Sequence, residues 1–252
     1  MKFNKSLPSD PLQPYIKYLV VSENTDENTY KVFPTTGLVI GFQYQGRLSS
    51  IQDQSEAPLA SAGISGISDT YRLFKNAADI GTILVYFTEV GFAHFSTLPA
   101  HELCGQSIEL THIFAPQQIA ETEEKLDTAS TDQQRIKIVE QFLLKQLKTI
   151  QTDQLIIQAV KKIYSTNGQL RIKQLAEELC ISQSPFEKRF RKLVGTTPKK
   201  FASIVRFNAV LNQVGQAKSL TELCYENNFF DQAHFIKEFK RFTGDTPENF
   251  KR

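Results

Sequence analysis

Short apolar runs separated by turn-forming residues fill the front of the chain, from about residue 14 to residue 88. This spacing is typical of β-strands, and no helix-length segment interrupts it. In the clearest run, every second residue from Leu38 to Tyr44 is apolar or aromatic, so period-two geometry places these side chains on one buried face. A tight turn is predicted at 45–47, with a hairpin partner around 48–51. The predicted strands are 31–33, 37–44, 59–64, 71–74 and 82–87.

The apolar spacing becomes helical after residue 88. Within 133–148, Ile136, Val139 and Leu143 recur at helical intervals, so one face of that segment is expected to pack. Residues 129–132 are predicted to form a loop that supplies its N-cap. The predicted helices are 90–95, 116–126, 133–148 and 154–165.

Polar residues concentrate at 149–153, between two apolar-periodic helices, and we predict a domain boundary there. Residues 1–150 then form a front domain, with strands at about 14–88 and helices at about 89–150. Residues 151–252 form a second, all-α domain. The fold class is therefore α+β, with a small β-barrel or sandwich at the front because no helices separate the strands.

An internal duplication marks the last third of the chain. The shared plan is a short helix, a tight turn, a longer helix, a glycine that ends it and a proline that opens the next helix. This plan is typical of a helix-turn-helix unit, whose second helix enters the major groove of DNA. We predict the first unit at about 172–194 and the second at about 220–243. Phe186, Phe190, Gly195, Pro198 and Phe201 recur 49 residues later as Phe235, Phe239, Gly244, Pro247 and Phe250.

Charge is divided unevenly between the two halves of the chain. Residues 1–160 hold 12 Lys and Arg against 18 Asp and Glu, a net charge of −6, and residues 161–252 hold 17 against 9, a net charge of +8. A concentrated positive charge favours a polyanion, because each phosphate that it neutralises releases counterions. Phenylalanine stripes alone would fit a plain helix bundle, but two copies in a basic segment favour DNA binding.

The outward positions of the two longer helices are the candidate DNA contacts. Side chains near the N-terminal end of such a helix lie deepest in the groove, and Gln, Arg and Lys can donate to base edges or phosphates. Ser182 and Asp231 are also predicted to cap these helices. Lysines and arginines farther along are assigned to phosphates, together with Arg189. The predicted DNA-binding residues are Ser182, Gln183, Ser184, Glu187, Lys188, Arg191, Lys192, Asp231, Gln232, Ala233, His234, Lys237, Lys240 and Arg241.

The segment 223–247 resembles the signature of the AraC family of bacterial transcription regulators, and the resemblance extends over about 154–252. It implies two helix-turn-helix units joined by a long helix, here about 199–213. It also implies a front domain that binds an effector or dimerises, commonly a cupin-like barrel followed by helices. The family usually has Ala, Gly and Ser where this chain has Cys224, Asn228 and Ala233. Ala233 thus lacks a hydroxyl near the DNA.

The resemblance sets the expected partners and the place of action. Double-stranded DNA, a small-molecule effector, a second copy of the chain as a homodimer and, for an activator, RNA polymerase are expected. No cofactor is expected. Residues 1–14 have no apolar core after their lysines, and the strongest apolar run, 83–87, is far too short to cross a bilayer, so a cytoplasmic protein without membrane contact is expected. Cys104, Cys180 and Cys224 are interpreted as reduced core thiols, the last two within apolar helices.

The front domain does not reveal its ligand. A weaker resemblance to the front domains of such regulators rests on Phe33 and Pro34 ahead of the 37–44 strand. A sugar pocket, a fatty-acid pocket and a dimerising surface all fit this strand pattern. Side chains that could offer polar contacts inside a barrel are Tyr44, Tyr71, Arg72 and Tyr86, although ordinary strand residues with surface hydroxyls are the favoured interpretation.

Two rival functions remain open. A metal-dependent cupin enzyme fused to a DNA-binding tail would need closely spaced histidines on a strand, and the sequence has no His-x-His. His94, His101 and His112 lie near Cys104, but hydrogen-bonded histidines fit their spacing better than zinc ligands. No metal ligands and no catalytic residues are predicted, so an enzyme is not expected. The other rival is a protein-interaction adaptor that has lost DNA binding; a steep salt dependence of duplex binding would favour the regulator over both.

Overall fold

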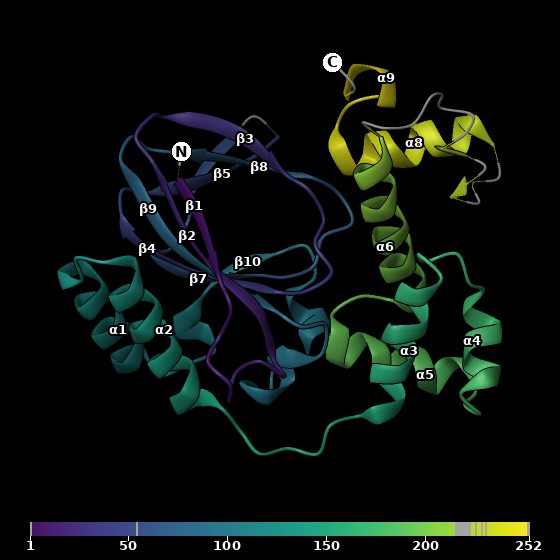
Figure 1. Ribbon diagram of the computed structural model, residues 1–252, viewed down its shortest axis with the longest axis horizontal. Helices are drawn as coiled ribbons and strands as arrows, with labels where there is room; N and C mark the ends of the chain where they lie inside the picture. Colours follow the sequence, from purple (N-terminus) through teal and green to yellow (C-terminus); the bar gives the residue numbers. More distant parts are fainter. Residues whose placement is uncertain are drawn as a thin grey trace.

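The computed structural model describes residues 2–53, 55–214, 223–224, 226–227, 229 and 231–250. Two antiparallel sheets form the front of the molecule, and a separate group of helices follows them (Figure 1). In the described chain one sheet has the order β1-β2-β9-β4-β7-β10 and the other β3-β8-β5-β6. The α+β class predicted from the sequence is confirmed. The strands are β1 (Lys2–Ser6), β2 (Ile16–Asn24), β3 (Asn28–Val32), β4 (Val39–Gln45), β5 (Leu48–Gln52), β6 (Ser55–Pro58), β7 (Ala62–Ser65), β8 (Arg72–Asn76), β9 (Ile80–Phe87) and β10 (Ser107–Glu109).

The sequence pattern missed β1 and β2, which pair with each other at one edge of the larger sheet. The register of β2 against β9 shifts between Ile16 and Tyr18, so strict alternation breaks at the start of β2. Val20 and Val21 are both fully buried, which also hides the period of two. β1 is a mostly exposed edge strand with a polar sequence, and it pairs through the backbone and through polar side chains such as Lys2, which lies 3.0 Å from Glu23 of β2.

The core of the front part lies between the larger sheet and two helices, α1 (Pro116–Thr128) and α2 (Asp132–Gln146) (Figure 1). Leu38, Ile40 and Phe42 are fully buried in it, as the alternation predicts. Phe42 meets Phe142 of α2 edge to face, with ring centroids 5.6 Å apart. The predicted N-cap of α2 is present as a capping box, in which Thr131 and Gln134 exchange hydrogen bonds.

The predicted hairpin at 45–47 is wrong, although the turn exists. β4 belongs to the larger sheet and β5 to the smaller one, so the turn carries the chain from one sheet to the other. Gly46 has φ +66°, and a Cβ there would lie 2.9 Å from the Cα of Ile80. The side chain of Gln43 accepts a hydrogen bond from the backbone N–H of Leu48 at 2.7 Å, which fixes the corner. Such corners are how sandwiches connect their layers.

Three short 3₁₀ helices connect the sheets to α1: η1 (Gly91–His94), η2 (Ala100–Leu103) and η3 (Leu110–His112). The predicted helix at 90–95 is thus only a 3₁₀ turn. Ala100 and Leu103 of η2 are buried in the front core. η2 is therefore held firmly against the sheets.

The C-terminal part is built from helices around a second core. Its helices are α3 (Gln154–Ser165), α4 (Ile172–Glu178), α5 (Gln183–Val194), α6 (Pro198–Gln213), α8 (Gln232–Thr243) and α9 (Pro247–Phe250). None of the helices in the described ranges is long and apolar enough to cross a membrane. Most of the first helix predicted for the second unit, at 220–230, falls outside the described residues.

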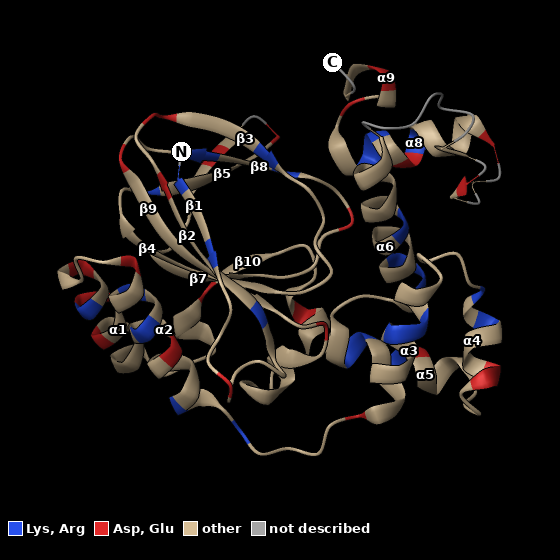
Figure 2. Ribbon diagram, in the orientation of Figure 1, with Lys and Arg blue, Asp and Glu red and all other residues tan. Residues whose placement is uncertain are grey.

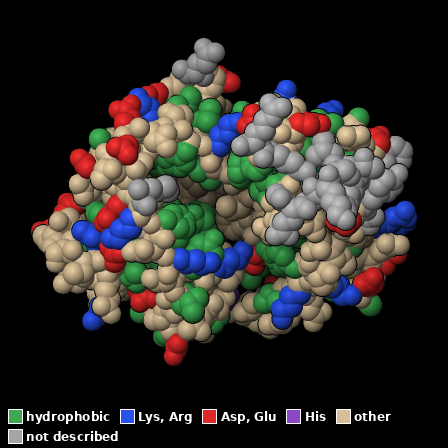
Figure 3. All heavy atoms as spheres, turned by 45° about the horizontal axis from the view of Figure 1, so that its top comes forward, with side chains coloured by type: hydrophobic (Ala, Val, Ile, Leu, Met, Phe, Trp, Pro, Cys, Tyr) green, Lys and Arg blue, Asp and Glu red, His purple; other side chains and the backbone are tan. Residues whose placement is uncertain are grey.

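The two parts touch directly although the chain between them, 147–153, has no helix or strand. Phe33 of the front part lies 6.4 Å from Phe207 of α6 and 5.7 Å from Phe250 of α9, measured between ring centroids. Ile67 of the front part is buried in the C-terminal core. On the face shown in Figure 3 the surface is hollowed near its middle, and hydrophobic side chains gather beside the hollow.

The three cysteines are free thiols in different surroundings. Cys224 is buried, as expected from its apolar helix. Cys104 and Cys180 are both exposed, so the prediction that they are core residues is wrong. Cys180 has φ +52° and occupies the turn between α4 and α5. The apolar pattern continued across this position, but the left-handed turn rotates its side chain away from the core.

The Phe42→Ala variant is expected to lose about 3 to 5 kcal/mol of the free energy of unfolding, because it leaves a cavity between the larger sheet and α2. Urea denaturation followed by circular dichroism measures this loss. Phe3→Ala is the matched control, since the Phe3 side chain is 53% exposed and is expected to change stability by less than about 0.5 kcal/mol. Equal losses in the two variants would contradict the placement of the front core.

Candidate nucleic-acid interface

α5 is the longer helix of the first predicted unit, and its inner face is fixed by Phe186, Phe190 and Val194, all fully buried. Gly195 ends the helix in the left-handed region at φ +99°. Thr197 then caps α6, accepting a hydrogen bond from the N–H of Lys200 at 3.2 Å. The side chain of Ser182 makes no capping bond, so the predicted cap at the start of α5 is absent.

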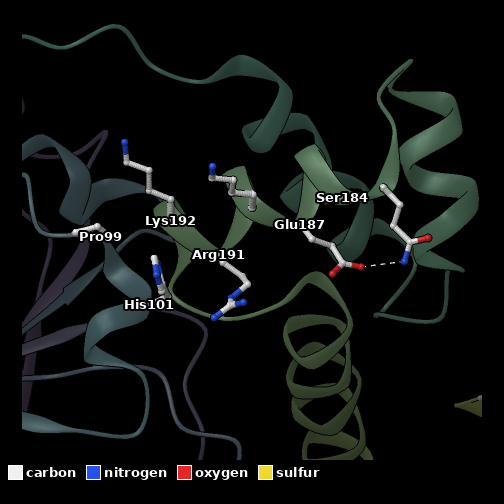
Figure 4. Close-up of a pocket in the computed structure, with 8 residues that line it drawn as sticks. Pro99, His101, Ser184, Glu187, Arg191 and Lys192 are labelled. Atoms are coloured by element: carbon white, nitrogen blue, oxygen red, sulfur yellow. Dashed lines mark hydrogen bonds between the residues drawn. The ribbon is translucent and has the colours of Figure 1, made fainter.

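The opposite face of α5 carries the predicted DNA contacts. Ser182, Gln183 and Ser184 at its start are exposed, and Glu187 is half-buried. Lys188, Arg191 and Lys192 follow on the exposed side. Six of these side chains line a cleft of about 660 Å³ whose other wall belongs to the front part (Figure 4). The residues lining this cleft are Pro99, His101, Gln183, Ser184, Glu187, Lys188, Arg191 and Lys192.

Gln183 and Glu187 are one turn apart and act as a pair. The Gln183 side-chain amide N–H donates to a carboxylate oxygen of Glu187 at 2.9 Å (Figure 4). This bond uses one of the two N–H groups of the Gln183 amide and leaves the other N–H and carboxamide and carboxylate oxygen acceptors unused by the pair. The start of α5 therefore presents a donor and acceptors, a combination that suits adenine, while the carboxylate alone suits the amino group of cytosine.

The cationic side chains near α5 fall into two groups: those that have a carboxylate partner among the described residues and those that do not. Arg189 donates to both carboxylate oxygens of Asp153 at 2.7 Å, so the prediction that it binds phosphate is not supported by its contacts. Among the described residues, Lys188, Arg191 and Lys192 make no ion pair. Unpaired cations on one face keep their charge available to a polyanion. Figure 2 shows Lys and Arg distributed along α5, α6 and α8.

α8, the longer helix of the second unit, repeats this design. Phe235, Phe239 and Phe242 are each 1% exposed and face the core, as predicted. Asp231 caps the helix by accepting from the N–H of His234 at 2.7 Å, which confirms the predicted cap and engages its carboxylate. The predicted contacts of this helix, all exposed, are Asp231, Gln232, Ala233, His234, Lys237, Lys240 and Arg241.

An ion pair that the sequence pattern did not reveal holds α8 to α6. Arg206 of α6 donates to Glu238 at 2.9 Å, and the two side chains are only 16% and 12% exposed. The Arg206 guanidinium also lies over the ring of Phe229, 4.4 Å from its centroid. α6 thereby sets the position of α8, since this pair is shielded from water on both sides. Arg241 lies 3.6 Å from the same carboxylate and is more exposed.

The four residues considered as ligand contacts do not line one cavity. The Tyr44 hydroxyl donates to Glu23 at 2.7 Å, and its ring lies under Arg135. Tyr71 lies against Gly244 of the C-terminal part, where a Cβ would meet its ring at 2.7 Å. Arg72 donates to the Ser107 hydroxyl at 3.0 Å and to backbone carbonyls, and burial lowers its pKa. Each of these three side chains is thus occupied by protein.

Tyr86 of β9 is the exception, because no hydrogen bond engages its hydroxyl in the described chain. Its ring lies 4.6 Å from that of Tyr18, and burial raises its pKa to about 12. The Lys5 ammonium lies 3.7 Å from the centroid of the Tyr18 ring. An aromatic surface with one nearby cation is therefore the one feature of this set that could receive a ligand.

The histidines considered as zinc ligands are separate from one another. His94 is buried beside Tyr15, with ring centroids 4.3 Å apart, and burial lowers its pKa. His101 lies on η2 at the α5 cleft and His112 is exposed on η3. Within the described ranges no group of three or more His, Cys, Asp or Glu side chains is arranged to hold a metal ion.

Two family models match different parts of the chain. Residues 175–252 match the model of a helix-turn-helix domain. The matched segment is similar to the helix-turn-helix domains of AraC-type regulators. This segment includes α5, α6 and α8, so the resemblance seen in the sequence is confirmed. Residues 4–109 match a domain of unknown function, DUF6597, and this range covers the strands of the described chain apart from the first two residues of β1.

Individual relatives are similar to the chain at low identity. The Msm operon regulatory protein of Streptococcus mutans is 29% identical over 119 residues, which are 46% of this chain. The matched region spans 43% of the length of that relative. Among solved structures, ToxT of Vibrio cholerae is 12% identical with a TM-score of 0.49, covering 92% of this chain and 97% of that one. The xylose-binding transcription activator XylR is 21% identical with a TM-score of 0.36, over 47% of this chain and 37% of its own.

We expect Arg206→Met to lower the free energy of unfolding of the helix-turn-helix domain by about 3 kcal/mol, because Glu238 then stays mostly buried without its closer partner. Thermal unfolding followed by circular dichroism at 222 nm provides the measurement. Arg189→Met is the matched control: its side chain is 46% exposed in the pair with Asp153, so a loss below about 1 kcal/mol is expected. If both variants melted alike, α6 would not position α8 through this pair.

Proposed function

We propose that this protein is a sequence-specific DNA-binding transcription regulator. The observation that carries the proposal is the repetition of one design in α5 and α8: a buried phenylalanine stripe on one face and exposed polar or cationic residues on the other. Plain bundle packing would explain the buried stripe but gives no reason for unpaired cations on the opposite face of both helices. A duplex explains both features.

The proposed binding mode places α5 and α8 in successive major-groove segments on one side of the duplex. α6 has 16 residues, and at 1.5 Å per residue it is about 24 Å long. Adding the helices at its two ends brings the separation to the order of the 34 Å turn of B-DNA. Each chain would then contact an asymmetric site of about two turns.

The contacts that we propose follow from exposure and position. At the starts of the two helices, the residues proposed to contact bases are Ser182, Gln183, Ser184, Glu187, Gln232, Ala233 and His234. Farther along, those proposed to contact phosphates are Lys188, Arg191, Lys192, Lys237, Lys240 and Arg241. Asp231 remains in the set as the cap that orders the first turn of α8.

For the front part, residues 1–150, we propose control of DNA binding through an effector or a homodimer, with an activator also contacting RNA polymerase. Tyr86 and Tyr18, with Lys5 nearby, are the surface proposed for an effector. We further propose that the boundary to the domain at 151–252 lies in the segment without helix or strand. A regulator of this kind acts in the cytoplasm and is not an enzyme, and its relatives by domain are regulators.

The salt dependence of binding tests the proposal. Fluorescence anisotropy with duplexes selected from a random pool is expected to show specific binding at low salt. The logarithm of the association constant should fall with the logarithm of the salt concentration with a slope on the order of −5, because about six phosphates lose counterions. A protein-interaction adaptor that has lost DNA binding predicts no such slope. Absence of any complex in 50 mM salt would refute the regulator.

A second experiment separates base contacts from phosphate contacts. Glu187→Ala and Gln183→Ala are each expected to relax the preference for cytosine or adenine at one position under α5, at a cost of about 1 to 3 kcal/mol for the best duplex. Lys240→Ala should instead weaken all duplexes alike and reduce the salt slope by about 1. Sequencing of bound fragments reports the preferences, and a uniform loss in all three variants would overturn the proposed base contacts.

A further inference from the structure

The cleft beside α5 is shared between the two parts of the chain. One side comes from α5, and His101 of η2 and the preceding residue, Pro99, close it at the C-terminal end of that helix (Figure 4). The contact is close: a Cβ on Gly195 would lie 3.2 Å from the carbonyl oxygen of Ala100. The front part therefore reaches the face that we propose for DNA.

η2 is held rigidly at this place. Ala100 is 2% exposed and Leu103 1% exposed, both within the front core. A Cβ on Gly66 would lie 1.8 Å from the carbonyl oxygen of Leu103, so only glycine permits the strand end to approach η2 this closely. The position of His101 relative to α5 is thus set by packing on both sides of the helical turn.

One ring nitrogen of the His101 imidazole is available to donate a hydrogen bond. Its Nδ1 atom is buried and has no hydrogen-bond partner in the described chain. Since a neutral imidazole carries one N–H, and a buried N–H without an acceptor is costly, the proton belongs on Nε2. In Figure 4 the ring lies beside Arg191 and Lys192 at the end of α5.

A duplex bound to α5 brings phosphates to this end of the helix. An α-helix with its side chains is about 10 to 12 Å wide and fills a major groove of about 12 Å. The N-terminal end of α5 lies deepest in the groove. Groups beside its C-terminal end therefore meet the sugar-phosphate backbone and not base edges. Arg191 and Lys192 provide the charge there without ion pairs of their own among the described residues.

We propose that His101, a residue of the front part, is an additional DNA contact that donates a hydrogen bond from Nε2 to a backbone phosphate next to α5. The proposal rests on the proposed function and deepens it: the DNA site is built by both parts of the chain. His101 adds affinity without base preference, since phosphates carry no sequence information.

The test compares full-length variants on the best selected duplex by fluorescence anisotropy. His101→Leu removes the donor and is expected to weaken binding about fivefold, whereas His101→Gln keeps a donor and is expected to bind within about twofold of the wild type. His101→Lys adds a charge and should make the salt slope steeper by about 0.9. A purely structural role for His101 would not change this slope.

Matched controls come from the exposed histidine of η3. His112→Leu and His112→Lys are expected to leave affinity and slope unchanged, because His112 does not line the cleft. Thermal unfolding confirms that each variant is folded. If the His101 variants matched the His112 variants, His101 would not contact DNA and the inference would be overturned.

The remaining outcomes are equally decisive. Tighter binding by His101→Leu than by the wild type would mean that η2 obstructs the duplex, which also overturns the inference. If the wild type bound no DNA, both this inference and the proposed function would fail. Wild-type binding with unaffected His101 variants removes only the inference.

Discussion

The burial of paired phenylalanines against α6 is the interaction on which the rest of the C-terminal architecture depends. Phe190 meets Phe201 at the start of α6, and Phe239 and Phe242 meet Phe207 farther along, with ring centroids 4.5 to 5.8 Å apart. Each aromatic side chain buries a large apolar area, and each contact turns one face of α5 or α8 inward. The opposite faces must then point outward, because a helix that buries one stripe exposes the other. The surfaces that we propose for DNA are thus a geometric consequence of the core, and one helix, α6, determines how far apart they lie.

Charge is added to this framework in two distinct ways. Arg206 and Arg189 have carboxylate partners, and they join helices to each other or to the start of α3. The cations of the outward face of α5 lack such partners in the described chain. Paired charges join parts of a folded protein, whereas unpaired surface charges stay hydrated and available to a partner. Arg206 and Arg189 therefore maintain the fold, and the cations on the outward face of α5 are available to bind a polyanion. The net charge of the segment could not make this distinction, which required the contacts of each side chain.

Local patterns in the sequence predicted much of this molecule, and long-range pairing explains what they missed. The alternation around Ile40, the duplicated phenylalanine stripes and the caps at Thr131 and Asp231 are each written within a few residues, and each is found. β2 was missed because a register shift interrupts its period, and β5 was assigned to the wrong partner because the turn at Gly46 looks the same whether the chain stays in one sheet or changes sheets. The position of His101 beside α5 had no local signal at all, since it depends on how residues far apart in the chain pack.

The joint between the two parts combines apolar contacts with a few exposed charges, and this composition bears on regulation. Lys200 lies 2.8 Å from Asp69, but the two side chains are 51% and 33% exposed, so the pair contributes at most about 1 kcal/mol. Phe33, against Phe207 and Phe250, supplies apolar contact of the order of 2 kcal/mol, and the buried side chain of Ile67 adds a contact of about the same size. A ligand at one hundred times its dissociation constant contributes about 2.7 kcal/mol to the state that it binds. That energy is similar to one of these apolar contacts and smaller than their sum, so an effector bound in the front part would offset one contact of the joint without unfolding either core.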